Sequence, residues 1–509
     1  MKKLAVLCIL CLLLTGCQAN KAPSSDVKIE LQDSGITVDG TAIGSDTSLA
    51  VYAANDIVYY PTGQDHTFGE GTEADAHEAS EAEGHTVVHI TKAGTYSLSG
   101  SLSAGQIAVD LGEDARDDPN AVATLVLDGV DIQCSVAPAV IFYNVYECSN
   151  GNQPTQTVDT SHAGANVYVG DDTVNNISGS YVARIYEPGT VELSEDGTEV
   201  LDAKKLHKYD AAFYSKMSMN IDGDDGILNI KAENEGLDSE LHLTINGGNI
   251  RILSGNDGIN TNEDGVSVTT VNGGTLDIQV TGETGEGDGI DSNGWLVING
   301  GAVSASACAF SGDAGIDSDM GIYLNGGTVM ASGHMLDRIA GGEQNYAVFT
   351  FAETQKGGTA YTLKNSSGKD VLTCAPVNDF SVLILAGDLI KAGEHTLWMG
   401  ETQLSASAGR GFDGGRMPGG REFSDGERPE MPEGMTPPKG MEFPEGERPQ
   451  PPEGMAFPEG EPPQMPEGMQ PPQGGQGFGR PDFEMGEAST TFEIRDGGNY
   501  FSFVKPQTE

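Results

Sequence analysis

Hydrophobic and polar positions repeat along the middle of this chain with a period of about 26 residues. An apolar residue followed by Asn-Gly-Gly occurs four times, at intervals of 26, 27 and 26 residues, with the asparagines at Asn246, Asn272, Asn299 and Asn325. The residues one position before each asparagine and four and six positions after it are aliphatic. Alternation with a period of two indicates half-buried strands, and the Gly-Gly pairs give the backbone freedom that a tight corner needs.

A repeat of this length, made of short strands and turns, is typical of one coil of a parallel β-helix. We therefore expect an all-β fold with no helical segment, in which Ile250, Leu276, Val303 and Val329 stack inside. Weaker copies extend the pattern toward the N-terminus, at Leu98-Ser99-Gly100, Leu127-Asp128-Gly129 and Ile221-Asp222-Gly223. The stretch from Asp171 to Met219 keeps no register, which predicts an excursion from the coil.

The first 17 residues have the pattern of an export signal. Lys2 and Lys3 precede an apolar run that is too short to span a bilayer, and the run ends in Leu-Thr-Gly-Cys at Cys17. This ending resembles the lipobox of bacterial lipoproteins. The resemblance implies cleavage before Cys17, lipid attachment to its thiol, and a location in the cell envelope outside the cytoplasmic membrane. An ordinary cleaved signal with a coincidental cysteine is the alternative.

Residues 409–486 are a different kind of polymer, with 16 of the chain's 24 prolines and 8 of its 15 methionines. This composition cannot bury a core and predicts a disordered insertion, acting as a spacer or as a partner-binding arm. Strand-like sequences follow it. The predicted order is a signal peptide (1–16), a tether and the start of the fold (17–45), the β-helix (46–333), C-terminal capping strands (334–408), the insertion (409–486) and closing strands (487–509).

Charge and cysteine content limit the partners. The chain has 27 basic and 76 acidic residues, a net charge of −49. Nucleic acid is therefore an unfavourable partner, and we expect contact with the membrane only through the lipid anchor. We also expect a monomer.

Cys134 and Cys148 are close enough in sequence for a disulfide, a pairing that the sequence leaves open, whereas Cys308 and Cys374 should pack as small apolar residues.

Acidic residues flank a second repeated phrase, Gly-(Ile/Leu)-(Asp/Asn)-(Ser/Thr). If the repeats stack, so do Glu235, Asp238, Asp257, Asn260, Asp288, Asp291, Asp313 and Asp317. Stacked carboxylates repel one another, so they need protons or a hard cation such as Ca²⁺, which takes about six to eight oxygen ligands. The alternative is that these side chains serve turns by bonding their own backbone. The repeated asparagines predict a ladder of amide hydrogen bonds.

Several phrases in order carry a resemblance to a known family. They are Ile90 to Gly100, Leu127 to Val130, Ala212 to Lys216, and the repeats up to Gly333. The chain resembles a bacterial carbohydrate-binding family, typified by a clostridial cellulose- and polygalacturonate-binding protein and similar to pectate lyases. The resemblance implies a right-handed parallel β-helix with bound Ca²⁺. It carries the calcium positions onto Asp257, Asp288, Asp291 and Asp317, and with less support onto Asp238 and Asn260. Ala314 replaces an acid in the last repeat.

Three functions follow as alternatives. The first is a cell-surface lipoprotein that binds an acidic, pectin-like or cellulosic polysaccharide without cutting it, with Trp295 and Tyr323 as weak candidates for glycan contact. The second is a calcium-dependent polysaccharide lyase, which needs a base beside the acidic phrases. The only lysines or arginines between Lys231 and Lys356 are Arg251 and Arg338. The third is a structural surface protein or adhesin.

Overall fold

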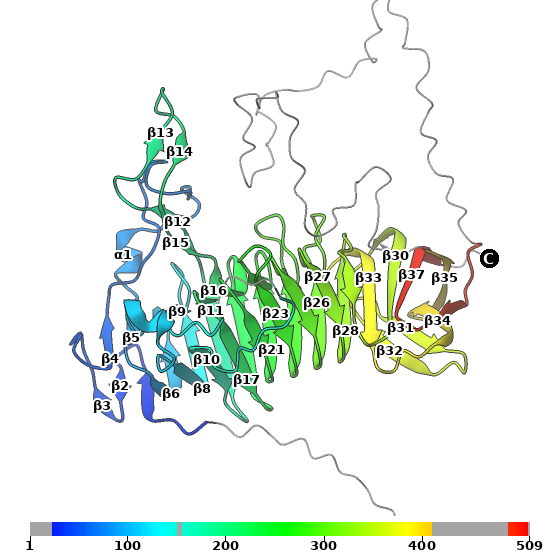
Figure 1. The fold of residues 1–509 in the computed structure, drawn as a ribbon, viewed down its shortest axis with the longest axis horizontal. Helices are drawn as coiled ribbons and strands as arrows, with labels where there is room; N and C mark the ends of the chain where they lie inside the picture. Colours follow the sequence, from blue (N-terminus) through cyan, green and yellow to red (C-terminus); the bar gives the residue numbers. More distant parts are fainter. Residues whose placement is uncertain (1–22, 150–154, 410–486, 507–509) are drawn as a thin grey trace, which may run out of the picture. The chain divides into compact units, whose positions relative to one another are not determined.

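The computed structural model describes residues 23–149, 155–409 and 487–506. Within them the chain is almost entirely β-structure, and most strand pairings are parallel (Figure 1). The predicted all-β fold is confirmed. The prediction of no helical segment is wrong, because the structure contains two short helices, α1 (Ala79–Ala82) and the 3-10 helix η1 (Glu113–Asp117). Both lie before the strong repeats. Cys17 and all but the first residue of the predicted insertion lie outside the described residues.

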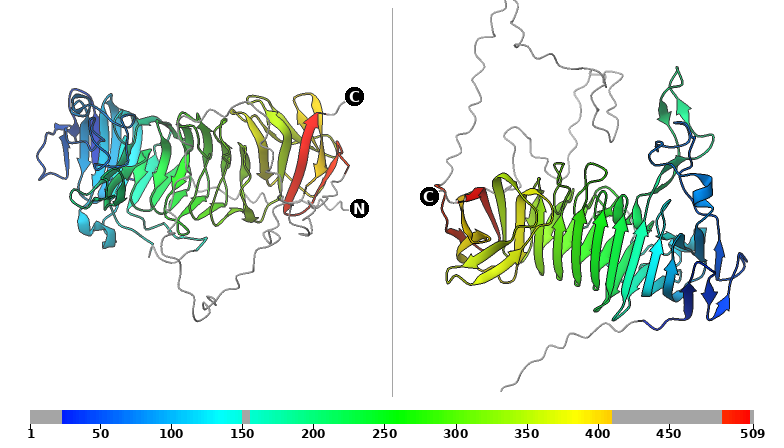
Figure 2. Two further views of the ribbon diagram at one scale, coloured as in Figure 1. Left: turned by 90° about the horizontal axis from the view of Figure 1, so that it is seen from above. Right: turned by 180° about the vertical axis from the view of Figure 1, so that it is seen from behind.

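The strands of successive repeats pair in three ladders, seen as stacked rungs in Figures 1 and 2. Ladder I is parallel and contains β1 (Val27–Leu31), β6 (Gly94–Leu102), β8 (Ala123–Gln133), β10 (Ala165–Val169), β17 (Met219–Gly223), β20 (Leu243–Ile245), β23 (Val268–Val271), β25 (Trp295–Ile298), β27 (Gly321–Leu324) and β29 (Ile339–Gly341). Ladder II continues from β6 and β8 through β11 (Val174–Gly179), β18 (Ile227–Ala232), β21 (Asn249–Ser254), β24 (Thr275–Val280), β26 (Ala302–Ser306) and β28 (Thr328–Gly333). Ladder III contains β5 (Thr86–Ile90), β7 (Gly105–Asp110), β9 (Val140–Asn144), β16 (Ala211–Ser215), β19 (Glu235–Ser239) and β22 (Ile259–Thr261).

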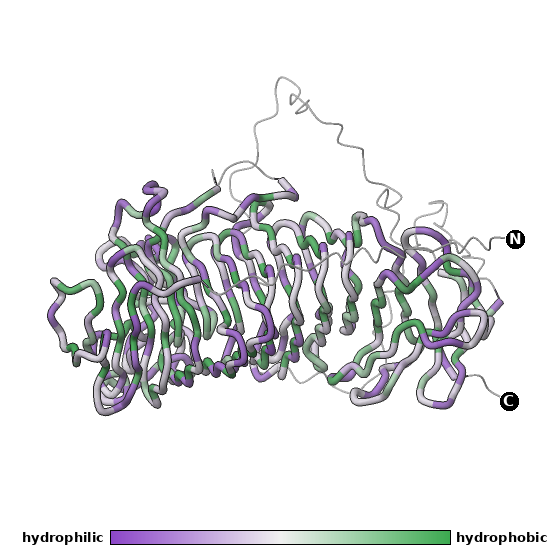
Figure 3. Tube along the Cα trace, turned by 90° about the horizontal axis from the view of Figure 1, so that it is seen from below, coloured by the Kyte–Doolittle hydropathy of each residue, from purple (hydrophilic) through white to green (hydrophobic). Residues whose placement is uncertain are grey.

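The aliphatic columns read from the sequence form the core between the ladders. Ile250, Leu276, Val303 and Val329 pair in register on ladder II, and each is at most 3% exposed. Arg251, between two inward side chains, is exposed, as the period of two requires. Figure 3 shows the resulting alternation of hydrophobic and hydrophilic residues along the strands. Removal of these aliphatic side chains from water is the main stabilisation of the stack.

The repeated asparagines form the predicted ladder. Nδ2 of Asn272 donates to Oδ1 of Asn246 at 2.9 Å, Asn299 to Asn272 at 2.9 Å, and Asn325 to Asn299 at 2.8 Å. Each amide therefore satisfies its neighbour at the same corner of successive repeats, and the column fixes the register between them.

The predicted excursion is real but shorter than expected. Val174–Gly179 is in parallel register with Ile227–Ala232, so the first part of the stretch belongs to ladder II. The chain then leaves the stack as two antiparallel pairs, β12 (Val182–Tyr186) with β15 (Lys205–Tyr209), and β13 (Glu192–Leu193) with β14 (Val200–Asp202). We call residues 180–210 the arm; it rejoins the stack at β16 (Figure 1). At the N-terminal end three further strands pair antiparallel. β2 (Thr37–Val38) pairs with β1 and with β3 (Thr41–Ala42), and β4 (Val51–Ala54) pairs with β5.

Strands that pair mainly antiparallel cover the other end of the stack, where β33 pairs with β28. These strands are β30 (Tyr346–Gln355), β31 (Tyr361–Asn365), β32 (Asp370–Cys374), β33 (Phe380–Gly387), β34 (Gly393–Met399), β35 (Thr402–Ala408), β36 (Phe492–Ile494) and β37 (Gly498–Pro506). The four described cysteines are free, so Cys134 and Cys148 are not bridged, and Cys308 and Cys374 are buried. No helix in the described ranges is long and apolar enough to cross a membrane.

Candidate functional site

The acidic phrases stack along ladder III. Leu237 pairs with Ile259, and Ile259 bridges to Ile290; together with Ile316, these side chains are fully buried. The glycine of each phrase allows this close approach: a Cβ on Gly258 would lie 2.2 Å from Cγ2 of Ile278. In each phrase the aliphatic side chain points into the core, and this fixes the direction of the neighbouring acidic side chains. The acidic side chains of successive repeats therefore point the same way and approach one another.

The first cluster of acidic side chains lies where the arm rejoins ladder III, and we call it group one. Carboxylate oxygens of Asp210, Glu235 and Asp238 lie within 4.8 Å of one another, and all three residues are buried. Lys208 forms an ion pair with Asp210. Nδ2 of Asn260 donates to Oε1 of Glu235 at 3.2 Å. Oε2 of Glu235 and Oδ1 of Asn260 are buried without a hydrogen-bond partner, so two oxygens are available to a ligand.

The second cluster, group two, lies two repeats further along. Carboxylate oxygens of Asp288, Asp291 and Asp317 lie within 4.8 Å of one another, and the three residues are partly buried. Oδ1 of Asp317 is buried without a hydrogen-bond partner. No ion pair within the described ranges reaches these three carboxylates. Group two is therefore the less compensated of the two acidic groups.

Burial is the largest cause of raised pKa values in both groups, and neighbouring carboxylates add to it. In group two the pKa of Asp288 is raised to about 8, that of Asp317 to about 7 and that of Asp291 to about 6. In group one the pKa of Glu235 is raised to about 8, and that of Asp238 is well above its ordinary value. At neutral pH, Glu235, Asp238 and Asp288 therefore keep their protons unless a cation replaces them, Asp317 is about half ionised, and Asp291 is mostly ionised.

Two of the acids bond to the backbone of the next repeat, whereas the turn alternative predicts bonds to their own backbone. Oδ1 of Asp257 accepts the N–H of Asp288 at 2.7 Å, and Oδ1 of Asp288 accepts the N–H of Ala314 at 2.6 Å. Each bond joins one repeat to the next and uses one oxygen, which leaves the second oxygen of the carboxylate for another ligand. A bond between repeats and cation binding are therefore compatible in the same side chain.

The structure divides the six predicted metal ligands. Asp288, Asp291 and Asp317 meet in group two, whereas Asp238 lies in group one with Asn260 beside it, and Asp257 bonds to the backbone of the next repeat. Sequence reasoning missed Asp210, because it follows the arm, where no register is readable. The available signal was its position directly before Ala211, which pairs with Glu235.

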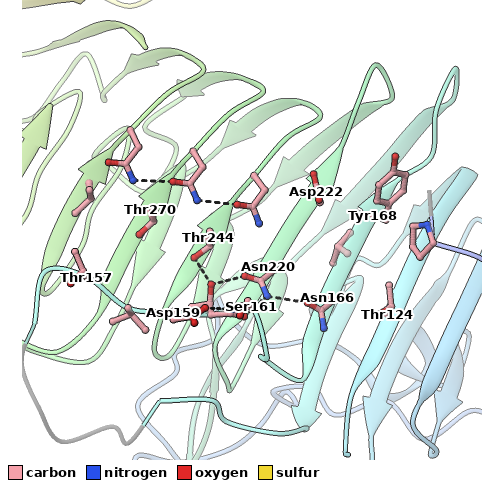
Figure 4. Close-up of a pocket in the computed structure, with 18 of the residues that line it drawn as sticks. Thr124, Thr157, Asp159, Ser161, Asn166, Tyr168, Asn220, Asp222, Thr244 and Thr270 are labelled. Atoms are coloured by element: carbon pink, nitrogen blue, oxygen red, sulfur yellow. Dashed lines mark hydrogen bonds between the residues drawn. The ribbon is translucent and has the colours of Figure 1, made fainter. Parts of the chain in front are cut away.

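A polar groove of about 690 Å³ runs across the outer face of ladder I. One column of outward side chains passes through Asn166, Asn220, Thr244 and Thr270 on successive strands (Figure 4). A segment containing Asp159 and Ser161 lies beside it, and Thr160 of that segment donates its hydroxyl to Oδ1 of Asn220 at 2.7 Å. The groove presents amides and hydroxyls, which are groups that hydrogen-bond sugar hydroxyls.

The two aromatic candidates lie near the far end of this column. Trp295 is only 8% exposed and packs with Val268 and Val297. Tyr323 pairs in register with Val297 and is half-buried against the same cluster, together with Val158. Tyr323 thus offers part of its ring to the surface, whereas Trp295 offers little.

Comparison with known proteins adds the class of ligand. Residues 83–333 match the profile of a family described as "Carbohydrate-binding domain-containing protein". This segment is similar to members of that family. The matched range contains both acidic groups and, except for Pro23, the residues that line the polar groove, and it supports the family resemblance noted in the sequence. No curated protein matches the chain.

One solved structure aligns with the chain. It is a polysaccharide lyase-like protein from C. thermocellum, in a gadolinium derivative, with 20% identity over 62% of this chain and 98% of that chain and a TM-score of 0.31.

Proposed function

We propose that this chain binds polysaccharide without cutting it, on a right-handed parallel β-helix loaded with Ca²⁺. The observation that carries the proposal is the match of residues 83–333 to a carbohydrate-binding family. The three ladders support a helical coil, and connections between parallel strands of one sheet are right-handed in about 98% of cases. The hand can be tested by a crystal structure.

Ca²⁺ fits the two acidic groups by ligand chemistry. Every side-chain atom that could coordinate the ion is an oxygen. Three of these oxygens, on Glu235, Asn260 and Asp317, are buried without a hydrogen-bond partner. Hard cations prefer carboxylate and amide oxygens, and an unpaired buried carboxylate is costly. Group one already has the ammonium of Lys208, whereas no basic residue of the described ranges pairs with group two, so group two is the stronger candidate.

The proposal of binding without cleavage is supported by the contacts of three basic side chains, Arg251, Arg338 and Lys208. Eliminative cleavage beside a uronate carboxylate needs a free base. Arg251 is exposed on ladder II, and the guanidinium of Arg338 donates to the carbonyl of Met320 at 2.6 Å. Lys208 lies next to group one, but although its burial opposes the charge, the carboxylate of Asp210 raises its pKa, so it keeps its proton. None of these described side chains is poised to take a proton.

A glycan array in calcium and in excess EDTA tests the function. We expect acidic or cellulosic glycans to bind in calcium, and acidic glycans to be lost in EDTA. Absence of binding to every glycan in both buffers would contradict the proposal.

The proposed location is the cell envelope, with the chain anchored through a lipid on Cys17 and contacting the membrane only there. Metabolic labelling with a fatty acid should mark the wild-type protein and leave Cys17→Ala unlabelled, because the thiol is the attachment point. Both proteins should be compared at equal abundance by immunoblot. Equal labelling of the variant would rule out this anchor.

A further inference from the structure

A second groove, of about 520 Å³, lies where the arm, η1 and ladder III come together. Its basic lining residues come from different elements: Arg116 from η1, Arg184 from β12, Lys208 from β15 and Lys216 from the turn after β16. Only 27 of the chain's 509 residues are lysine or arginine, yet four of the 13 residues that line this groove are. We call it the basic groove.

The four cations are not equally compensated. Nε of Arg184 lies 3.0 Å from Oε2 of Glu70, and Lys208 is paired with Asp210. Arg116 is exposed and Lys216 is half-buried, and neither has an ion-pair partner within the described ranges. In a chain with a large excess of acids, two unpaired cations therefore face the same groove.

Three acids also line the groove, but within the described ranges none of them forms an ion pair with Arg116 or Lys216. Oε1 of Glu240 accepts a hydrogen bond from the hydroxyl of Tyr214. Glu113 and Glu263 are exposed to solvent. A guanidinium and an ammonium that line one groove without an ion-pair partner are suited to a carboxylate or sulfate, because charge-assisted hydrogen bonds to such groups are short and strong.

We propose that the basic groove binds the anionic groups of an acidic polysaccharide, with Arg116 and Lys216 as the contacting residues, whereas the charges of Arg184 and Lys208 are already compensated by Glu70 and Asp210. This inference rests on the proposed function and deepens it, because it assigns the carboxylates of the glycan to a site that needs no metal. Group one lies beside the groove through Lys208, so a chain that crosses both meets fixed cations and the acidic groups in turn. The proposal also gives the arm a role in binding, because the arm contributes two of the four cations that line the groove.

The test compares R116E/K216E with K231E/R251E at constant calcium, using polygalacturonate, a sulfated glycan and a neutral cellulosic glycan as probes. Lys231 and Arg251 are exposed on ladder II, so the control makes the same change of charge elsewhere. We expect R116E/K216E to lose about tenfold or more in affinity for polygalacturonate, with unchanged melting temperature and unchanged binding of any neutral glycan. The control should change less than about twofold, because distant exposed charges are screened. R116Q/K216Q should give an intermediate loss.

Three results would overturn the inference, and they are separable. Equal losses in both double variants would show a general effect of net charge, and full affinity in R116E/K216E would show that the groove is not used. If the sulfated glycan binds and polygalacturonate does not, sulfate is the anion and the carboxylate assignment is wrong. Failure of the wild-type protein to bind any probe would instead refute the proposed function itself.

Discussion

Removal of calcium is expected to lower the melting temperature of the wild-type protein at pH 7.5 by several degrees. Asp288, Asp291 and Asp317 bring carboxylate oxygens within 4.8 Å of one another, without a basic partner in the described ranges. An ion present at about a hundred times its Kd stabilises the native state by about 2.7 kcal/mol. Each 1 kcal/mol shifts the melting temperature of a domain of about 150–250 residues by about 2–4 °C, and that of a larger domain by less.

Asp288→Asn with Asp291→Asn should remove most of this response. The variant keeps amide oxygens but loses two charges, so its ion affinity falls while the repulsion in the metal-free state is relieved. Its melting temperature should therefore be nearly the same in calcium and in EDTA. Asp131→Asn with Asp277→Asn is the matched control, because these exposed acids lie on ladder II. Scanning calorimetry that shows no calcium shift in the wild type, or an equal loss of the shift in the control, would contradict the account.

The metal-free protein is expected to become less stable as the pH rises from about 5 to about 8. In the native state burial and neighbouring acids raise the pKa of Asp291 to about 6, of Asp317 to about 7 and of Asp288 to about 8. Unfolded aspartates have pKa values near 3.9. Over this range the native state binds more protons than the unfolded state, so the free energy of unfolding falls with rising pH.

Calcium should flatten this dependence, since it replaces the protons that the native carboxyl groups hold. The measurement is the urea midpoint between pH 5 and 8, in EDTA and in calcium, for the wild type and for the Asp288→Asn, Asp291→Asn variant. The EDTA slope should be smaller in the variant, because two of the titrating groups are gone. A wild-type protein that gains stability with rising pH in EDTA would show that these acids are not protonated in the native state.

The regular part of the fold could be predicted because one repeat constrains the next. Ile250 and Leu276 recur at one phase of the period and are buried in register, and the same phase brings Asp288, Asp291 and Asp317 together. Periodicity carries this information without knowledge of distant contacts.

The rest depends on contacts that have no period. Lys208 and Asp210 reach group one through the arm, whose length and path no repeat specifies. Trp295 is buried in a cluster that Val158 packs against, far earlier in the chain. The free thiols of Cys134 and Cys148 likewise could not be deduced from their spacing, because only the positions of the two side chains decide whether a bond forms.

The most direct test of calcium-dependent binding without cleavage is an equilibrium titration of the wild-type protein with polygalacturonate, in calcium and in excess EDTA. The absorbance of the double bond that eliminative cleavage creates should be followed in the same samples. The account predicts saturable binding in calcium, loss of that binding in EDTA, and no increase in absorbance in either buffer. Equal affinity in EDTA would contradict the role of calcium, and a steady increase in absorbance would show that the protein is a lyase.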